Sequence, residues 1–196
     1  MSGSKAFPGF SNIYVLEDTG NSVAFRGKIS LDDQFVVTRA EETPTGPVEV
    51  RWAMGRKKPS DIIHTTYVTP LLISDRVASI LEGGEHSGWQ TYPVELSGKD
   101  GLRIPGYRGF AVSGRCGPID ESRCVRLDKI YPGGVFPAWY GMYFDPATWD
   151  GSDLFMPSGR VGWIFAVEAV KKAFEKAKVT NVAFTSLDKK EVQRLL

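Results

Sequence analysis

The chain has 196 residues, of which 42% are hydrophobic and 24% charged, which is the composition of a globular domain and not of a disordered segment. Its 24 lysines and arginines balance 23 aspartates and glutamates, for a net charge of +1. A nucleic-acid-binding protein usually carries a clear basic excess with which it neutralises phosphates, so the charge balance argues against nucleic acid as a partner.

Targeting signals and metal-binding motifs are not recognisable in the sequence. No stretch approaches the ~20 apolar residues of a membrane span, and the first ten residues lack the apolar core of a signal peptide. The cysteines, Cys116 and Cys124, are too few and wrongly spaced for a closed zinc site. We therefore expect a cytoplasmic protein with two reduced thiols, no cofactor, no metal and no membrane partner.

The first 55 residues are predicted to be rich in β structure. Residues 12–16 form a short apolar run, and residues 22–29 partly alternate apolar with polar side chains. Residues 48–52 alternate strictly, which is typical of a half-buried strand.

The clearest local signal is a helix over residues 74–82. Ser74 is a good N-cap because its hydroxyl can accept a hydrogen bond from a free amide of the first turn, and Asp75 carries the charge that the helix dipole favours there. A double glycine follows and predicts the helix end. The apolar side chains expected to form its buried face are Val77, Ile80 and Leu81.

The central part of the chain is harder to interpret. Residues 89–96 are predicted to form a strand, in which Pro93 indicates an edge position or a bulge. Residues 98–134 are rich in glycine, so we expect hairpins and irregular loops there. The glycine spacing matches neither the dinucleotide-binding motif nor the P-loop, which argues against a phosphate cradle.

An aromatic and acidic segment covers residues 136–155. One interpretation is a contact surface, because tyrosine and tryptophan anchor many protein interfaces. The other, favoured for most of the individual rings, is that they close one end of the core and that the aspartates form turns. The spacing lacks the terminal glutamate of a calcium-binding loop. The candidate contact residues are Trp139, Tyr140, Tyr143, Asp145, Trp149, Asp150 and Asp153.

The C-terminal part is predicted to contain a strand, a helix and a second strand. Residues 161–165 and 179–184 form the two apolar runs. The helix between them has an apolar stripe and a favourable Glu168–Lys172 pair, and Ser186 is a candidate cap for a last turn. Since strands and helices do not alternate regularly, we expect a single α+β domain over residues 1–196, mostly antiparallel sheet with two or three helices. The helical stripe consists of Val167, Val170, Ala173, Phe174 and Ala177.

Three sequence patterns carry a resemblance to a known family. They are PLLISDRVASIL, then WDGSDLF, then GWIFAVEAVKKAFEKAKVTNVAF, and they span residues 70–187. Their order resembles the immunity proteins of bacterial polymorphic-toxin systems, especially the myxobacterial double-CXXCG group. The paired CXXCG motifs are missing, so zinc binding is not implied. The resemblance implies a family-like core over residues 60–196 that binds and neutralises a cognate protein toxin in the cytoplasm without catalysis.

Two functions of different classes follow from the sequence. The first is the toxin-binding inhibitor. The second is an enzyme acting on a small or carbohydrate substrate, with Asp145, Asp150 or Asp153 as acid and base beside Trp139 and Trp149. A cleft with facing carboxylates would favour the enzyme, and an exposed aromatic patch would favour the inhibitor. The sequence leaves the oligomeric state open.

Overall fold

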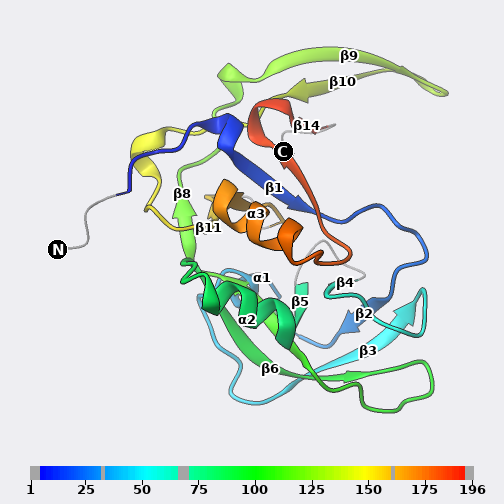
Figure 1. Ribbon diagram of the computed structural model, residues 1–196. Helices are drawn as coiled ribbons and strands as arrows, with labels where there is room; N and C mark the ends of the chain where they lie inside the picture. Colours follow the sequence, from blue (N-terminus) through cyan, green and yellow to red (C-terminus); the bar gives the residue numbers. More distant parts are fainter. Residues whose placement is uncertain (1–4, 32–33, 66–70, 160–161, 193–196) are drawn as a thin grey trace.

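The computed structural model describes residues 5–31, 34–65, 71–159 and 162–192, and a closed barrel forms one end of it (Figure 1). Its strands pair in the order β2-β3-β6-β7-β5-β4, and apolar side chains such as Phe25, Val50 and Leu72 fill the interior. The short helix α1 (Gln34–Thr38) packs Val37 against this cluster. The barrel strands are β2 (Arg26–Ile29), β3 (Val48–Met54), β4 (Ile62–Thr65), β5 (Leu71–Ser74), β6 (Trp89–Ser97) and β7 (Tyr107–Val112).

A five-stranded sheet forms the second layer, in the order β13-β1-β12-β11-β8. All its neighbours are antiparallel except β11 and β8. Helices α2 (Asp75–Gly83) and α3 (Glu168–Lys176) pack against each other, and their apolar faces join the large core of this sheet. The strands are β1 (Ile13–Glu17), β8 (Gly114–Cys116), β11 (Leu154–Pro157), β12 (Ile164–Val167) and β13 (Ala183–Ser186).

A third, three-stranded sheet has the order β14-β10-β9. Strands β9 (Val125–Tyr131) and β10 (Gly134–Tyr140) form a hairpin that projects from the body at the top of Figure 1, and β14 (Glu191–Val192) pairs with the base of β10. The described residues form mostly antiparallel sheets, three helices and a C-terminal strand–helix–strand unit in a single compact domain, so the predicted α+β class is confirmed. The remaining 3-10 turns are η1 (Phe10–Asn12), η2 (Glu121–Arg123), η3 (Pro146–Thr148) and η4 (Leu187–Lys189).

Helix α2 follows the sequence prediction closely. The Ser74 hydroxyl accepts a hydrogen bond from the Val77 amide at 3.3 Å, so the predicted N-cap is confirmed. The buried face is made by Val77, Ala78 and Leu81, whereas Ile80 is only partly buried. Ile80 lies at the flank because Ala78 and Leu81 move the centre of the buried stripe away from it. No helix in the described part of the chain is long and apolar enough to cross a membrane.

The C-terminal unit differs in detail from its prediction. Val167 was expected on the helix but is the last residue of β12, because it pairs with Ile13 of β1. Val170 and Phe174 are buried, and the Glu168–Lys172 pair forms at 3.1 Å. Ser186 precedes η4, but its side chain makes no capping hydrogen bond, so that expectation is wrong.

Two segments of the chain, one beginning with β5 and the other with β12, follow the same backbone path. β5 and β12 each have four residues and lead directly into a helix of nine residues. Past the helix ends, Glu85 and Lys178 occupy corresponding positions and both have positive φ, 50° and 53°. The next amide donates back to the helix at 3.0 Å in both units, from His86 to the carbonyl of Leu81 and from Val179 to that of Phe174.

The strand pairing repeats as well. β5 and β6 lie on either side of the antiparallel strand β7, and β12 and β13 lie on either side of β1. In the barrel, Phe110 of β7 pairs with Leu71 on one side and Thr91 on the other. In the five-stranded sheet, Leu16 of β1 pairs in the same way with Ile164 and Phe184. The fold therefore contains an internal structural repeat, one copy in each layer.

The pairing of β6 also corrects one expectation. Because β6 lies between β3 and β7, it is not an edge strand. Pro93 is tolerated because the pairing with β3 begins only at Val94, so the absent amide hydrogen of proline is not needed on that side.

Candidate functional site

The structure divides the aromatic and acidic segment between two places. Trp139 and Tyr140 end strand β10 in the projecting hairpin, whereas the residues from Tyr143 to Asp153 run along the body of the molecule. The predicted residues are therefore not gathered into one patch.

Trp139 and Tyr140 point to opposite faces of the hairpin, because successive side chains of a strand alternate. Trp139 pairs with Val192 of β14 and packs against the main core. Tyr140 pairs with Val125 across the hairpin and is 38% exposed. Of the two, Tyr140 is the ring available to a partner.

The rings of Tyr143 and Trp149 take part in an aromatic cluster. Tyr143 packs edge-on against Phe10, with 5.1 Å between ring centroids, and the Arg123 guanidinium lies 4.7 Å from its centroid. Trp149 contacts the rings of Phe7 and Phe155, each at 5.9 Å. Its indole N–H donates to the carbonyl of Ser152 at 3.1 Å. Both rings thus hold the N-terminal segment and the turn in place.

Two of the aspartates organise tight turns. The Asp145 carboxylate accepts a hydrogen bond from the Ala147 amide at 3.0 Å and caps η3. Asp150 accepts from the amides of Arg115 at 2.7 Å and of Ser152 at 2.9 Å, which joins the WDGSD turn to β8. These carboxylates satisfy backbone amides of the turns.

Asp153 is buried and fully engaged. It accepts hydrogen bonds from the ammonium of Lys5 at 2.8 Å and from the amide and hydroxyl of Ser87 at 3.0 and 3.2 Å. Burial by itself would raise the pKa of Asp153, but these donors and the nearby His86 outweigh it and hold the pKa below its usual range. A carboxylate held in its charged form in this way is poorly suited to act as a general acid.

The projecting hairpin carries most of the exposed apolar surface. Among the described residues, six of the ten exposed large apolar side chains lie on β9 and β10, and this concentration makes the hairpin the candidate contact surface. A two-stranded ribbon leaves much of its apolar surface exposed to solvent. The six residues are Val125, Leu127, Ile130, Val135, Phe136 and Tyr140.

The register of the hairpin places four of these side chains on one face. Val125 pairs with Tyr140, and Leu127 and Phe136 follow on the same face by the two-residue period of their strands. We call these four residues the apolar arm face. Val125 is 58% exposed and Phe136 49%. Exposed aromatic side chains of this kind are typical anchors of protein interfaces.

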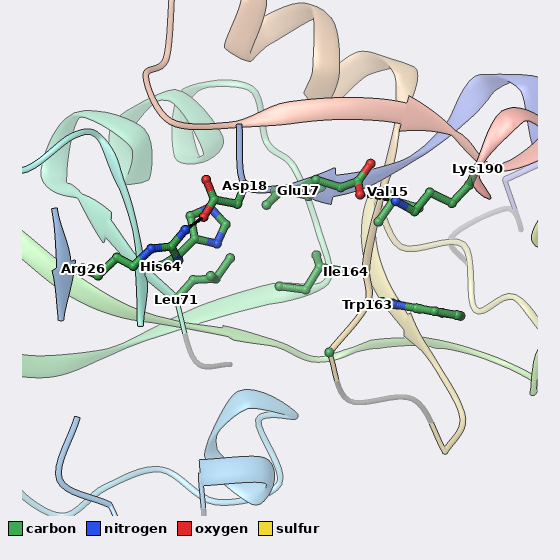
Figure 2. A pocket seen from close by; sticks show the side chains of 11 residues that line it. Val15, Glu17, Asp18, Arg26, His64, Leu71, Trp163, Ile164 and Lys190 are labelled. Carbon is green, nitrogen blue, oxygen red and sulfur yellow. Dashed lines mark hydrogen bonds and ion pairs between the residues drawn. The ribbon is translucent and has the colours of Figure 1, made fainter. Parts of the chain in front are cut away.

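A separate cavity of about 260 Å³ lies where the barrel meets the five-stranded sheet (Figure 2). Apolar side chains from β1, β5 and β12 line part of it, and Figure 2 shows Asp18, Arg26 and His64 gathered at one end. Arg26 is paired with Asp18, and Lys190 with Glu17.

His64 is the buried titratable group of this cavity. Its Nε2 lies 3.3 Å from the carbonyl oxygen of Asn181. Burial lowers the pKa of His64, and the neighbouring Asp18 carboxylate offsets only part of this effect. The imidazole is therefore neutral at pH 7, and Nε2 donates to Asn181 in that form. Since the charged side chains of the cavity are paired with one another, a polar ligand would have to displace these pairs.

Sequence reasoning missed both the hairpin surface and the cavity. The cavity residues come from widely separated stretches and form no motif. The hairpin did carry a signal, because residues 125–131 alternate between apolar and charged side chains in their first four positions.

The described residues contain no group of three side chains arranged to hold a metal ion. Cys116 is buried, which raises the pKa of its thiol to about 12, and Cys124 is half-buried with a raised pKa. Both thiols are protonated at neutral pH and unreactive as nucleophiles. Neither forms a disulfide.

Comparison with known proteins gives no family assignment. No family model matches the chain, and no curated protein matches it significantly.

Proposed function

We propose that this protein binds and neutralises a cognate protein toxin, as an immunity protein of a bacterial polymorphic-toxin system. It acts in the cytoplasm by forming a complex and not by catalysis. The sequence resemblance over residues 70–187 suggests the class of partner. The observation that carries the proposal is the apolar arm face, exposed on a hairpin that projects from the body (Figure 1).

The projecting geometry supports a binding role for this face. A hairpin that extends from a rigid body can enter a groove of a partner and bury both its rings and its aliphatic side chains. Tyr140 and Phe136 supply the rings, and Val125 and Leu127 supply the aliphatic surface around them. We assign the anchor role to Tyr140 and Phe136 because their rings are 38% and 49% exposed, whereas Trp149 is partly buried against the main core.

The test is co-expression with the product of the neighbouring gene. The wild-type protein should restore growth and co-purify with that product in a one-to-one complex. The double variant Phe136→Ser/Tyr140→Ala should lose both effects. Leu102→Ser is the matched control, because Leu102 is an exposed apolar residue of the loop between β6 and β7 in the barrel. If the arm variant protects as well as the control, the arm face is not the toxin-binding surface.

An enzyme acting on a small or carbohydrate substrate is the second candidate. The observation that favours it is the cavity around His64, with the Asp18 carboxylate beside the ring (Figure 2). Asp145, Asp150 and Asp153 are less suited to acid–base chemistry, since each carboxylate is hydrogen-bonded to backbone amides. A His64→Gln protein that still binds the toxin but no longer protects would favour the enzyme. Full protection would favour the inhibitor.

A further inference from the structure

The outer edge of strand β9 is open. Among the described residues, β9 pairs with β10 on one side and with no strand on the other. It is seven residues long, so its outer edge presents backbone donors and acceptors over ~23 Å. Its apolar side chains Val125, Leu127 and Ile130 are exposed, Ile130 to 86%. A long open edge with apolar side chains is a ready site for pairing with another strand.

The sequence of β9 is complementary to itself in one antiparallel register. When Leu127 lies opposite Leu127 of a second copy, Arg126 lies opposite Asp128 of that copy, and Asp128 lies opposite its Arg126. Opposite charges facing each other across two strands stabilise the pairing. Both side chains are available, since they are 65% and 59% exposed and form only a long contact of 3.4 Å within the strand.

The neighbouring registers are unfavourable. If Arg126 lies opposite Arg126 of the second copy, two guanidinium groups face each other at the centre of the strand pair. If Asp128 lies opposite Asp128, two carboxylates face each other there. Like charges directly opposite each other destabilise a strand pair. The charges therefore select the register centred on Leu127.

We propose that two copies of this protein associate through β9, antiparallel and about a two-fold axis at Leu127, to form a continuous six-stranded sheet. The interface is isologous, so each contact occurs twice. On one face Leu127 meets its counterpart and Val125 lies against Lys129 of the second copy. On the other face the two Arg126–Asp128 pairs flank the axis, and Ile130 lies beside Cys124 of the second copy.

This dimer does not depend on the proposed function. It forms through the backbone edge of β9, whereas the rings of the apolar arm face lie on β10. Val125 and Leu127 belong to both surfaces, so the two associations are measured separately. Dimerisation is measured on the protein alone, and toxin binding on the complex. The failure of one is therefore distinguishable from the failure of the other.

The first test is a charge exchange read out by sedimentation equilibrium. The wild-type protein should be a dimer at micromolar concentration. Arg126→Asp and Asp128→Arg should each weaken the dimer about tenfold or more, because each creates two like-charge contacts. The double variant Arg126→Asp/Asp128→Arg should restore it. Arg103→Asp is the matched control, because Arg103 is an equally exposed arginine near Glu95 on the barrel.

The second test is a register-specific cross-link in a Cys124→Ser background. Leu127→Cys should give a disulfide-linked dimer under oxidising conditions, because the axis brings the two positions together. Val125→Cys should not cross-link, since Lys129 of the second copy lies opposite. A wild-type protein that remains monomeric at about 100 µM overturns the proposal. Equal cross-linking at both positions would also overturn it. A monomer whose toxin complex is weakened by Arg126→Asp would assign the edge to the toxin instead.

Discussion

Two adjoining stretches of the chain, the hairpin of residues 125–140 and the turn region of residues 143–153, are both rich in aromatic and charged side chains, yet they use them differently. In the turn region, Asp145 and Asp150 bind backbone amides and Trp149 packs against two phenylalanines. In the hairpin, Phe136 and Tyr140 remain exposed.

The difference shows that composition alone does not identify a binding surface. An aromatic residue near the end of a strand is buried or exposed according to its parity, as Trp139 and Tyr140 demonstrate. Asp145 and Asp150 each accept a hydrogen bond from the amide two positions further on, which makes them turn residues. In the hairpin, the rings of Phe136 and Tyr140 stay partly exposed, at 49% and 38%, because the hairpin projects from the body (Figure 1).

The largest effect expected from this comparison is the loss of stability on truncating Trp149. Trp149→Ala removes the contacts with Phe7 and Phe155 and the hydrogen bond to Ser152, and should cost about 3 kcal/mol of unfolding free energy. Urea denaturation measures the loss. If Trp149→Ala keeps wild-type stability but no longer binds the toxin, the assignment of Trp149 to the core is wrong.

The second-largest loss of unfolding free energy, about 2 kcal/mol, is expected for Asp153→Asn, because the substitution weakens the hydrogen bonds from Lys5 and Ser87 at a buried position. The folded pKa of Asp153 is lowered, so its contribution is present above the usual carboxyl pKa of about 3.9 and is lost as the pH falls through the folded value. Urea midpoints measured from pH 7 to pH 3 should therefore show the gap between the two proteins closing on the acid side. A gap that does not change with pH contradicts this account.

A smaller loss of stability is expected at the N-terminus of helix α2, where the Ser74 side chain is the cap. Ser74→Ala should cost about 1 kcal/mol through the loss of the α2 cap. The repeat supplies a natural control, because Val167 occupies the corresponding position before α3 without a capping side chain. Val167→Ala should cost stability through lost packing and leave helix capping unaffected. Amide exchange in the first turn of each helix distinguishes the two effects.

The smallest effect on stability is expected in the arm. Phe136→Ser and Tyr140→Ala should each change the free energy of unfolding by less than about 0.5 kcal/mol, because both side chains are substantially exposed. A cooperative loss of more than 2 kcal/mol for either would mean that the arm face packs against the body.

Local features of the fold were predictable, and long-range ones were not. The Ser74 cap and the Glu168–Lys172 pair follow from residues within one helical turn. The barrel and the internal repeat depend on strands distant in sequence, and the two repeat units share a pattern of burial and few identical residues. The sequence pattern places the start of β12 too early for the same reason, because pairing with β1 sets where this strand begins.

The candidate site was predictable in part. Tyr140 was expected at a contact surface and lies on the arm face, whereas Asp153 was expected there and is buried. The sequence could not distinguish them, because exposure here depends on which elements cover each residue. His64 was visible only as an isolated histidine, since the cavity around it is assembled from strands of both layers.

The most direct test of the central claim is the affinity of the purified protein for the product of the neighbouring gene, measured by calorimetry on the wild type, the Phe136→Ser/Tyr140→Ala variant and the Leu102→Ser control. The account predicts that the arm variant binds about 30-fold more weakly or worse, the size of a hot-spot loss, while its urea midpoint stays that of the wild type. The control should bind like the wild type. A folded arm variant that binds with full affinity would contradict the account.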